Sequence, residues 1–190
     1  MKIIKLSDLS GNGVPRVEIL CDSALQKTGK PFFVPDFADR FTYRVAVAVH
    51  ICRLGKNISA KFANRYYDES GLAFLIEAED LYAKLQAENR PVSVADSFDG
   101  SVILGDVSSK YISDDICFDL RIDGRVEYHA DLRSIFTKLD SYIEYISKYF
   151  TLKIGDYILL DYDNCRNELK IGTNVAAFIN GDKSIDIKFK

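Results

Sequence analysis

Carboxylates gather at two places in this chain, in a density that could bind a cation or move a proton. The two groups are Glu77, Glu79 and Asp80, and further along Asp161, Asp163 and Glu168. Hard cations such as Mg²⁺ and Ca²⁺ prefer oxygen ligands, so each group is a candidate metal site. Acidic residues also stabilise the first turn of a helix by about 0.3–1 kcal/mol each without any ligand. The second group lacks the spacing and the glycine of a calcium loop. We therefore expect a helix start and a solvated loop.

The histidines and cysteines offer little local support for catalysis. His50 lies in a predicted strand and His129 lies near the end of another, and neither has an obvious catalytic partner. The cysteines are scattered and form no C-x-x-C pair: they are Cys21, Cys52, Cys117 and Cys165. This spacing supports neither structural zinc nor a disulfide framework, and nothing nearby predicts a lowered thiol pKa. We expect structural histidines, and small core cysteines in a reducing cytoplasm.

The composition is that of an ordinary globular domain. The chain has 190 residues, of which 47% are apolar and 28% charged, with a net charge of −3. No stripe of Lys and Arg is present, which argues against nucleic-acid binding. No apolar stretch approaches the roughly 20 residues needed to cross a bilayer, and the N-terminus does not have the pattern of a signal peptide. We expect one domain over residues 1–190 in the cytoplasm.

The elements that must position these side chains are mostly strands. In the first half we predict strands at 41–54 and 71–76, helices at 59–69 and 77–88, and a loop-rich region at 92–113. In the second half, strands flank a turn at Asp123-Gly124, and a helix spans 134–149. Further strands are predicted at 157–162, 174–180 and 184–189. Strands that outnumber helices and are joined by short turns indicate the α+β class.

Several stretches of the chain share a characteristic order and spacing. They are DSALQKTGKPFFVPDF (22–37), LGKNI (54–58), KFANRYYDE (61–69), FDGS (98–101), ISKYFTLKIGDYI (146–158) and IGTNV…INGD (171–182). Together they resemble the fumarylacetoacetate hydrolase family over about residues 17–190. The resemblance implies a mixed β-roll or sandwich with short peripheral helices, and a homodimer. Residues 1–16 would be a short N-terminal segment in place of the family's lid.

The resemblance also implies a chemistry. Family enzymes hydrolyse or isomerise C–C bonds next to diketo or enol groups with a divalent ion, Mg²⁺, Mn²⁺ or Ca²⁺. Two of the ion's ligands come from a Glu-x-Glu on a strand, and those positions match Arg44 and Ala46. The third ligand position matches Leu75 and the active-site lysine matches Asp96. A guanidinium and apolar groups cannot ligate a cation, so we expect no metal cofactor.

The residues that correspond to the family's active site form our candidate pocket. They are Arg44, Ala46, Leu75, Glu77, Asp96, Asp161 and Tyr162. None is assigned a catalytic or metal-binding role. Because a lone buried arginine is costly, we predict that Arg44 forms an ion pair with one of three acids, Asp96, Asp161 or Glu77. A separation of more than ~6 Å from all three carboxylates would contradict this prediction.

Three functions follow from a family scaffold with altered ligand positions. The first is a pseudoenzyme that binds a small anionic ligand beside Arg44. The second is a divergent hydrolase or isomerase for C–C bonds of acylpyruvate or 2-hydroxydienoate substrates. The third is a non-catalytic partner of an active homologue. The sequence favours the first, because the changes at the ligand positions extend to the lysine and to the loop at Asp161 and Tyr162.

Overall fold

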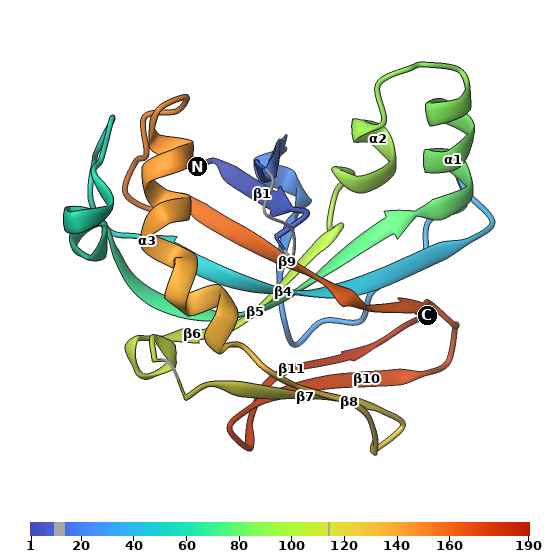
Figure 1. Ribbon diagram of the computed structural model, residues 1–190. Helices are drawn as coiled ribbons and strands as arrows, with labels where there is room; N and C mark the ends of the chain where they lie inside the picture. The colour runs from blue at the N-terminus through green and yellow to red at the C-terminus, as the bar shows by residue number, and fades with distance from the viewer. Residues whose placement is uncertain (10–13, 114) are drawn as a thin grey trace.

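Two β-sheets and a few short helices make up the fold (Figure 1). The structure is a computed structural model that describes residues 1–9, 14–113 and 115–190, apart from the side chains of residues 162–164. The helices are α1 (Glu79–Ala87), α2 (Ser93–Asp96) and α3 (Arg133–Ser147), with 3-10 turns η1 (Asp22–Ala24), η2 (Ala60–Arg65) and η3 (Ser109–Tyr111). This architecture confirms the predicted α+β class, a mixed sheet with short peripheral helices.

The larger sheet is mixed and has seven strands in the order β2-β1-β9-β4-β5-β6-β3. These strands are β1 (Ile3–Ser7), β2 (Arg16–Leu20), β3 (Leu25–Lys27), β4 (Phe41–Ile51), β5 (Tyr67–Ala78), β6 (Val102–Ser108) and β9 (Tyr157–Glu168). The smaller sheet is antiparallel, in the order β11-β10-β7-β8. Its strands are β7 (Cys117–Ile122), β8 (Arg125–Asp131), β10 (Asn174–Ile179) and β11 (Asp182–Lys188).

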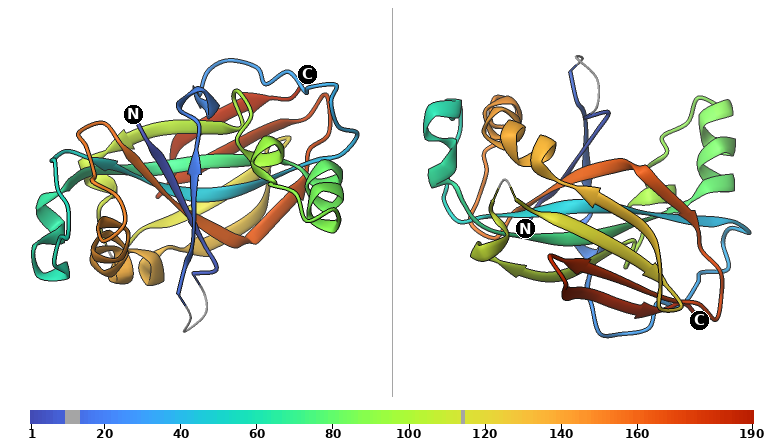
Figure 2. Two further views of the ribbon diagram at one scale, coloured as in Figure 1. Left: turned by 90° about the horizontal axis from the view of Figure 1, so that it is seen from above. Right: turned by 60° about the horizontal axis from the view of Figure 1, so that its bottom comes forward.

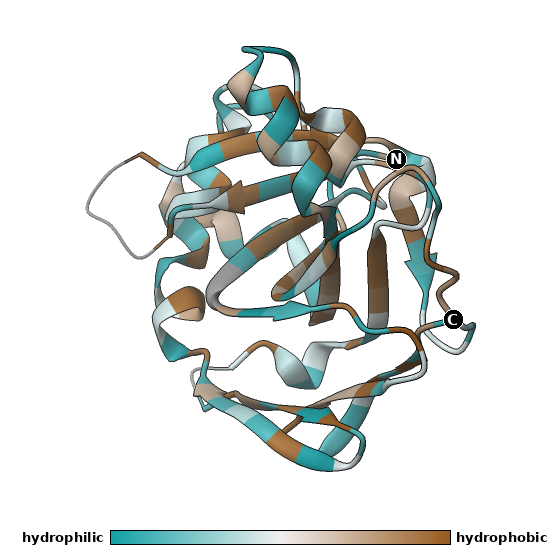
Figure 3. Cartoon of the chain, turned by 90° about the vertical axis from the view of Figure 1, so that its right-hand side faces the viewer, coloured by the Kyte–Doolittle hydropathy of each residue, from teal (hydrophilic) through white to brown (hydrophobic). Residues whose placement is uncertain are grey.

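The central strands of the larger sheet are covered on both faces. Val45, Val47 and Val49 of β4 belong to the main core, which also contains the inner faces of the smaller sheet and of α3. Ala46 and Ala48 alternate with them and belong to a second, smaller core on the opposite face. This double burial explains why β4 has an almost continuous apolar sequence. In the right-hand view of Figure 2, where the bottom of the molecule comes forward, the smaller sheet lies in front of the long strands, and Figure 3 shows apolar colour along several of the strands.

Several local predictions were wrong. The solvated loop expected at Asp161, Asp163 and Glu168 is part of β9, in which Asp161 is buried. Of the four cysteines expected in the core, only Cys165 is buried.

The helix expected over 59–69 is a 3-10 turn that ends at Arg65, after which the chain enters β5. Tyr67 and Glu69 pair with Ile51 and His50 of β4, so long-range pairing overrides the local pattern. The region 92–113, expected to be loop-rich, contains α2 and the strand β6. Gly105 suggested a break, but it lies inside the strand.

Other local predictions are confirmed. The hairpin of β7 and β8 turns at Asp123 and Gly124, whose φ angles of 49° and 82° explain the Asp-Gly sequence. The helix predicted over 134–149 is α3, and the one predicted over 77–88 is α1. Asp80 in the first turn of α1 accepts a hydrogen bond from the backbone N–H of Asp39, at 3.0 Å. That acid therefore has a structural role.

Gly105 joins the two sheets by close approach. A Cβ at this position would lie 2.7 Å from the carbonyl oxygen of Ser184, in β11. Backbone cannot yield as a flexible side chain does, so we expect Gly105→Ala to lower the free energy of unfolding by about 1–3 kcal/mol. Urea denaturation of both proteins measures this difference. A change within the error of the extrapolation would show that β6 and β11 separate easily.

The N-terminal residues are part of the sheet. β1 pairs with β2 in antiparallel and with β9 in parallel orientation. The backbone N–H of Lys2 donates to the carboxylate of Asp156 at 2.7 Å. Among the helices in the described part of the chain, none has the length and apolar character needed to cross a membrane.

Candidate functional site

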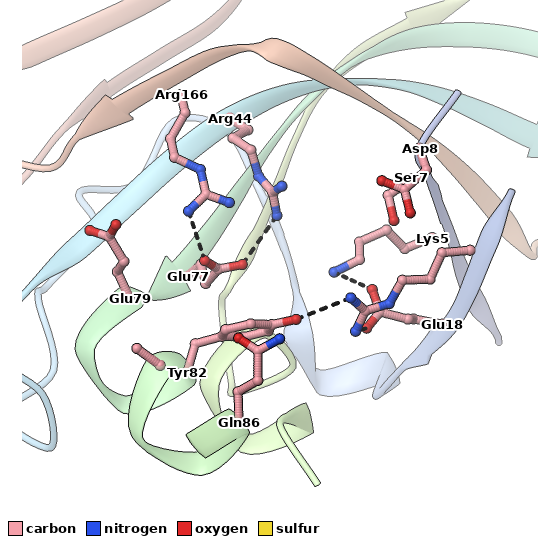
Figure 4. A pocket seen from close by; sticks show the side chains of 12 residues that line it. Lys5, Ser7, Asp8, Glu18, Arg44, Glu77, Glu79, Tyr82, Gln86 and Arg166 are labelled. Atoms are coloured by element: carbon pink, nitrogen blue, oxygen red, sulfur yellow. Dashed lines mark hydrogen bonds and ion pairs between the residues drawn. The ribbon is translucent and has the colours of Figure 1, made fainter. Parts of the chain in front are cut away.

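A polar pocket of about 330 Å³ lies between the large sheet and α1 (Figure 4). Its walls come from β1, β2, β4, β5, β9 and α1, and the side chains that line it include Lys5, Arg16, Glu18, Arg44, Glu77, Tyr82 and Arg166. Strands from both ends of the chain therefore meet at one place. The charged side chains fall into two groups, one on each side of the pocket (Figure 4).

The first group is built around Arg44. Its guanidinium lies 3.2 Å from the carboxylate of Glu77 and 3.1 Å from that of Asp161. Arg166 lies 3.1 Å from the other oxygen of Glu77. We call these four residues the Arg44 network. The Arg44 and Glu77 side chains are 10% and 6% exposed, and that of Asp161 is 0% exposed. Burial without pairing would be very unfavourable for any of these charges, so the network holds them together.

Strand register explains why the Arg44 network forms. Arg44 is directly opposite Leu75 on β5, and Glu77 follows two residues later on the same face. On the other side, the register between β4 and β9 shifts after Arg44, which is opposite Arg166 while Val45 is opposite residue 162. Such an irregularity re-aims side chains locally. Arg166 therefore reaches Glu77 across β4.

The second group is built around Lys5 of β1. Its ammonium lies 2.6 Å from Asp96 and 2.7 Å from Glu18, and its side chain is 5% exposed. Arg16 contacts Glu18 at 2.6 Å and donates to the hydroxyl of Tyr82 at 3.1 Å. Burial lowers the pKa of Lys5, but the attraction of Asp96 and Glu18 outweighs it and the pKa is raised. Lys5 is therefore a fixed positive charge at the pocket wall.

The two acids that hold Lys5 differ in their environment. Burial raises the pKa of Asp96, against the lowering effect of Lys5. Glu18 is more exposed, and although burial raises its pKa, Lys5 and Arg16 outweigh that effect and lower it. Asp96 is thus the acid whose proton affinity is increased in this group.

The predicted site residues are only partly brought together. Arg44 pairs with two of the three acids expected, Glu77 and Asp161, which confirms the predicted ion pair. Asp96 pairs with Lys5 instead. Ala46 and Leu75 belong to the smaller apolar core. The side chain of Tyr162 lies outside the described residues.

Lys5 is the main residue that sequence reasoning missed. It is the one charged residue in the strand IIKLS, whose five residues are all buried. A lysine inside an apolar strand requires a carboxylate partner, and that requirement was the available signal. The partner itself, 91 residues away in the chain, could not be named from the pattern.

Charged side chains of both signs line the pocket. Four are cations (Lys5, Arg16, Arg44 and Arg166) and four are anions (Asp8, Glu18, Glu77 and Glu79), and two further buried acids, Asp96 and Asp161, pair with Lys5 and Arg44. The side chains of Arg16 and Arg166 are 46% and 40% exposed, so both guanidinium groups reach solvent as well as their protein partners. A guanidinium has five N–H donors and can bind a carboxylate through two of them. The arrangement can therefore bind a small carboxylate at its mouth.

The sequence matches a known family model over most of its length. Residues 12–160 match the model described as "Fumarylacetoacetate (FAA) hydrolase C-terminal". Among curated proteins, a mitochondrial oxaloacetate tautomerase of Arabidopsis thaliana is 25% identical over 177 residues, covering 90% of this chain and 79% of that protein. An oxaloacetate tautomerase of Escherichia coli is 22% identical over 178 residues, covering 90% and 81%.

Solved structures match the fold closely at low sequence identity. The fumarylpyruvate hydrolase of Pseudomonas aeruginosa, in complex with Mn²⁺ and pyruvate, matches with a TM-score of 0.88 and 14% identity over 100% of this chain and 89% of that one. A 5-carboxymethyl-2-hydroxymuconate delta-isomerase of Mycobacterium smegmatis matches with a TM-score of 0.85 and 18% identity, covering 99% and 76%. These likenesses establish the fold.

Proposed function

Because the chain belongs to the fumarylacetoacetate hydrolase family, we propose that its pocket binds small oxo or enol carboxylates and promotes tautomerisation or isomerisation through cationic side chains. The observation that carries this proposal is the pair of half-exposed guanidinium groups, Arg16 and Arg166, at the mouth of a pocket with a buried ammonium in its wall. The names of the tautomerase relatives support the substrate class.

The divalent ion that the family implies does not suit the residues present here. At the matching positions the chain has the guanidinium of Arg44, the methyl group of Ala46 and the apolar side chain of Leu75. Two carboxylates do converge at this place, those of Glu77 and Asp161. The guanidinium of Arg44 lies 3.2 Å from the first and 3.1 Å from the second. A cation of the protein thus takes the place that a metal ion would need, and the proposed function includes no step through such an ion.

The roles of the side chains follow from their positions. Arg166 and Arg16 bind the carboxylate of the ligand, since charge-assisted pairs of this kind are strong and directional. Lys5 provides a fixed positive charge that stabilises the negative charge of an enolate as it forms. Asp96 pairs with Lys5 at 2.6 Å and holds that ammonium in place, and we propose that water entering the pocket takes the proton of the enol oxygen and supplies the proton that the carbon gains.

A second function is favoured by a specific observation. Three of the acids at the pocket wall are each held by a cation: Glu77 by two arginines, and Glu18 and Asp96 by Lys5. A base that is held in this way is a weaker proton acceptor. In this alternative the protein binds the oxo acid and does not convert it.

Ketonisation of enol-oxaloacetate in the presence of EDTA distinguishes the two functions. The loss of the ultraviolet absorbance of the enol is followed with and without protein. An acceleration that EDTA does not remove supports cation-assisted tautomerisation. Binding of oxalate, an enolate mimic, without any acceleration supports the non-catalytic alternative. An acceleration that appears only with Mg²⁺ would contradict the proposed role of the protein's own cations.

We expect Arg166→Gln to weaken oxalate binding by about tenfold or more, because one charge-assisted pair contributes roughly 1.5–3 kcal/mol. Isothermal titration calorimetry measures this change. Arg90→Gln is the matched control, since Arg90 is an exposed arginine paired with one acid, Glu88, and is not among the side chains that line the pocket. Equal affinity in both variants would remove Arg166 from the binding site.

A further inference from the structure

A second cluster of potential ligands lies at the far end of β4. His50, Asp68 and Glu69 each offer one ligand atom, and these atoms all lie within 4.8 Å of one another. The Nδ1 of His50 lies 2.7 Å from the carboxylate of Asp68. His50 follows Arg44 by six residues on the same strand, so at about 3.3 Å per residue the cluster is about 20 Å from the pocket.

An irregularity in the strand pairing creates the cluster. Glu69 is opposite His50, while the next pair along the ladder is Tyr67 with Ile51, so Asp68 is an extra residue of β5. In a regular strand Asp68 and Glu69 would point to opposite faces. A bulge places two residues of one strand against one residue of the other and re-aims their side chains. Both carboxylates therefore approach the same imidazole.

The cluster is partly open to solvent. The ring centroid of Tyr157 lies 5.3 Å from that of His50 and covers one side of the imidazole. The side chains of His50 and Asp68 are 22% and 49% exposed, so a cation from solvent can reach them.

We propose that His50, Asp68 and Glu69 bind one divalent first-row transition ion, with Zn²⁺ as the probe. One imidazole nitrogen and two carboxylates match the borderline character of such ions, whereas Mg²⁺ prefers an all-oxygen shell. Ligand atoms about 2.0–2.2 Å from one ion lie roughly 3–4 Å from each other. The present spread of up to 4.8 Å requires only small side-chain movements, and water completes the shell.

The chain provides its own control. His129 lies 2.6 Å from Asp119, a pair of the same kind as His50 and Asp68, and its side chain is 64% exposed. In the described part of the chain this pair is not within a group of three potential ligands. A single histidine–carboxylate pair and a three-ligand site can thus be compared in one protein.

Isothermal titration of the full chain with ZnCl₂ tests the proposal, with Mg²⁺ as the comparison ion. We expect saturable binding of about one equivalent of Zn²⁺ at this site, weakened at least about tenfold in both His50→Asn and Glu69→Gln and unchanged in His129→Asn. Circular dichroism of each variant verifies that it is folded. Cys52→Ser in the same titration separates the cluster from the neighbouring thiol.

Several results would overturn the proposal. These are the lack of saturable Zn²⁺ binding, equal binding by His50→Asn and the unchanged protein, or loss of binding in Cys52→Ser alone. Equal loss in His129→Asn and His50→Asn would indicate non-specific binding to histidine and would also overturn it. The titration follows Zn²⁺ binding at a cluster about 20 Å from the pocket. None of these results therefore depends on the function of the Arg44 pocket.

Discussion

Arg44→Ala is expected to lower the free energy of unfolding by about 3–5 kcal/mol at neutral pH. The substitution leaves Asp161, with its side chain 0% exposed, and Glu77, with 6% exposed, without the guanidinium that lies between them. A buried carboxylate that loses its partner retains its full desolvation cost. Because typical domains have a total stability of only about 5–15 kcal/mol, this loss approaches global unfolding. Urea denaturation measures it.

The control for Arg44→Ala is Arg166→Ala in the same network. Arg166 contacts the same acid, Glu77, but its side chain is 40% exposed, so solvent screens the pair and we expect a loss of no more than about 1 kcal/mol. A triple variant, Arg44→Ala with Glu77→Gln and Asp161→Asn, removes the stranded charges and should regain part of the stability. A loss below 1 kcal/mol for Arg44→Ala alone would show that the acids find other partners or water.

Arg44→Glu is expected to convert the Arg44 network into a site for a hard cation. The new carboxylate would lie between Glu77 and Asp161, which are 3.2 and 3.1 Å from the present guanidinium. Three carboxylates that have only the half-exposed Arg166 as a counter-charge repel one another, so the variant should be less stable than Arg44→Ala in EDTA. Mg²⁺ should reverse much of this loss, since a ligand at 100 times its Kd adds about 2.7 kcal/mol to stability.

Thermal denaturation with and without millimolar Mg²⁺ measures this conversion. Arg44→Gln is the matched control, because it has the same shape as Arg44→Glu without the charge, and its melting temperature should not respond to Mg²⁺. The unchanged protein should not respond either. If Arg44→Glu is unaffected by Mg²⁺, the acids are too far apart to share an ion, and the idea that Arg44 takes the place of a metal is wrong. If the unchanged protein is stabilised, the same idea fails.

The fold could be predicted from the sequence where local pattern and final pairing agree. The almost continuous apolar sequence of β4 and the Asp123-Gly124 turn specify their structures within a few residues. The prediction failed at Tyr67–Glu69, where an apparent helix end becomes strand because β4 is available as a partner. It also failed at β6, where Gly105 looked like a break but is required by contact with Ser184.

Of the two groups of charged side chains in the candidate site, only the one around Arg44 was predicted from the sequence. Arg44 is a charged residue within an apolar strand, and the cost of a lone buried charge predicts acids nearby. Lys5 carries the same signal, a charge in an apolar strand, but its partner Asp96 becomes a neighbour only when β1 is placed in the sheet. Pairs of this kind depend on the full topology and are not encoded in any short stretch of sequence.

The placement of β1 against β9 has a consequence for how the molecule acquires its structure. The contact of Lys2 with Asp156 spans 154 residues. Lys5 is part of β1, so it lies at the pocket wall only after β1 has paired with β9. Contacts so distant in sequence are slow to form, because a large loop must close first. During synthesis the first strand must wait until most of the chain has left the ribosome. The pocket is thus assembled late, and an N-terminal fragment that ends before β9 would lack it.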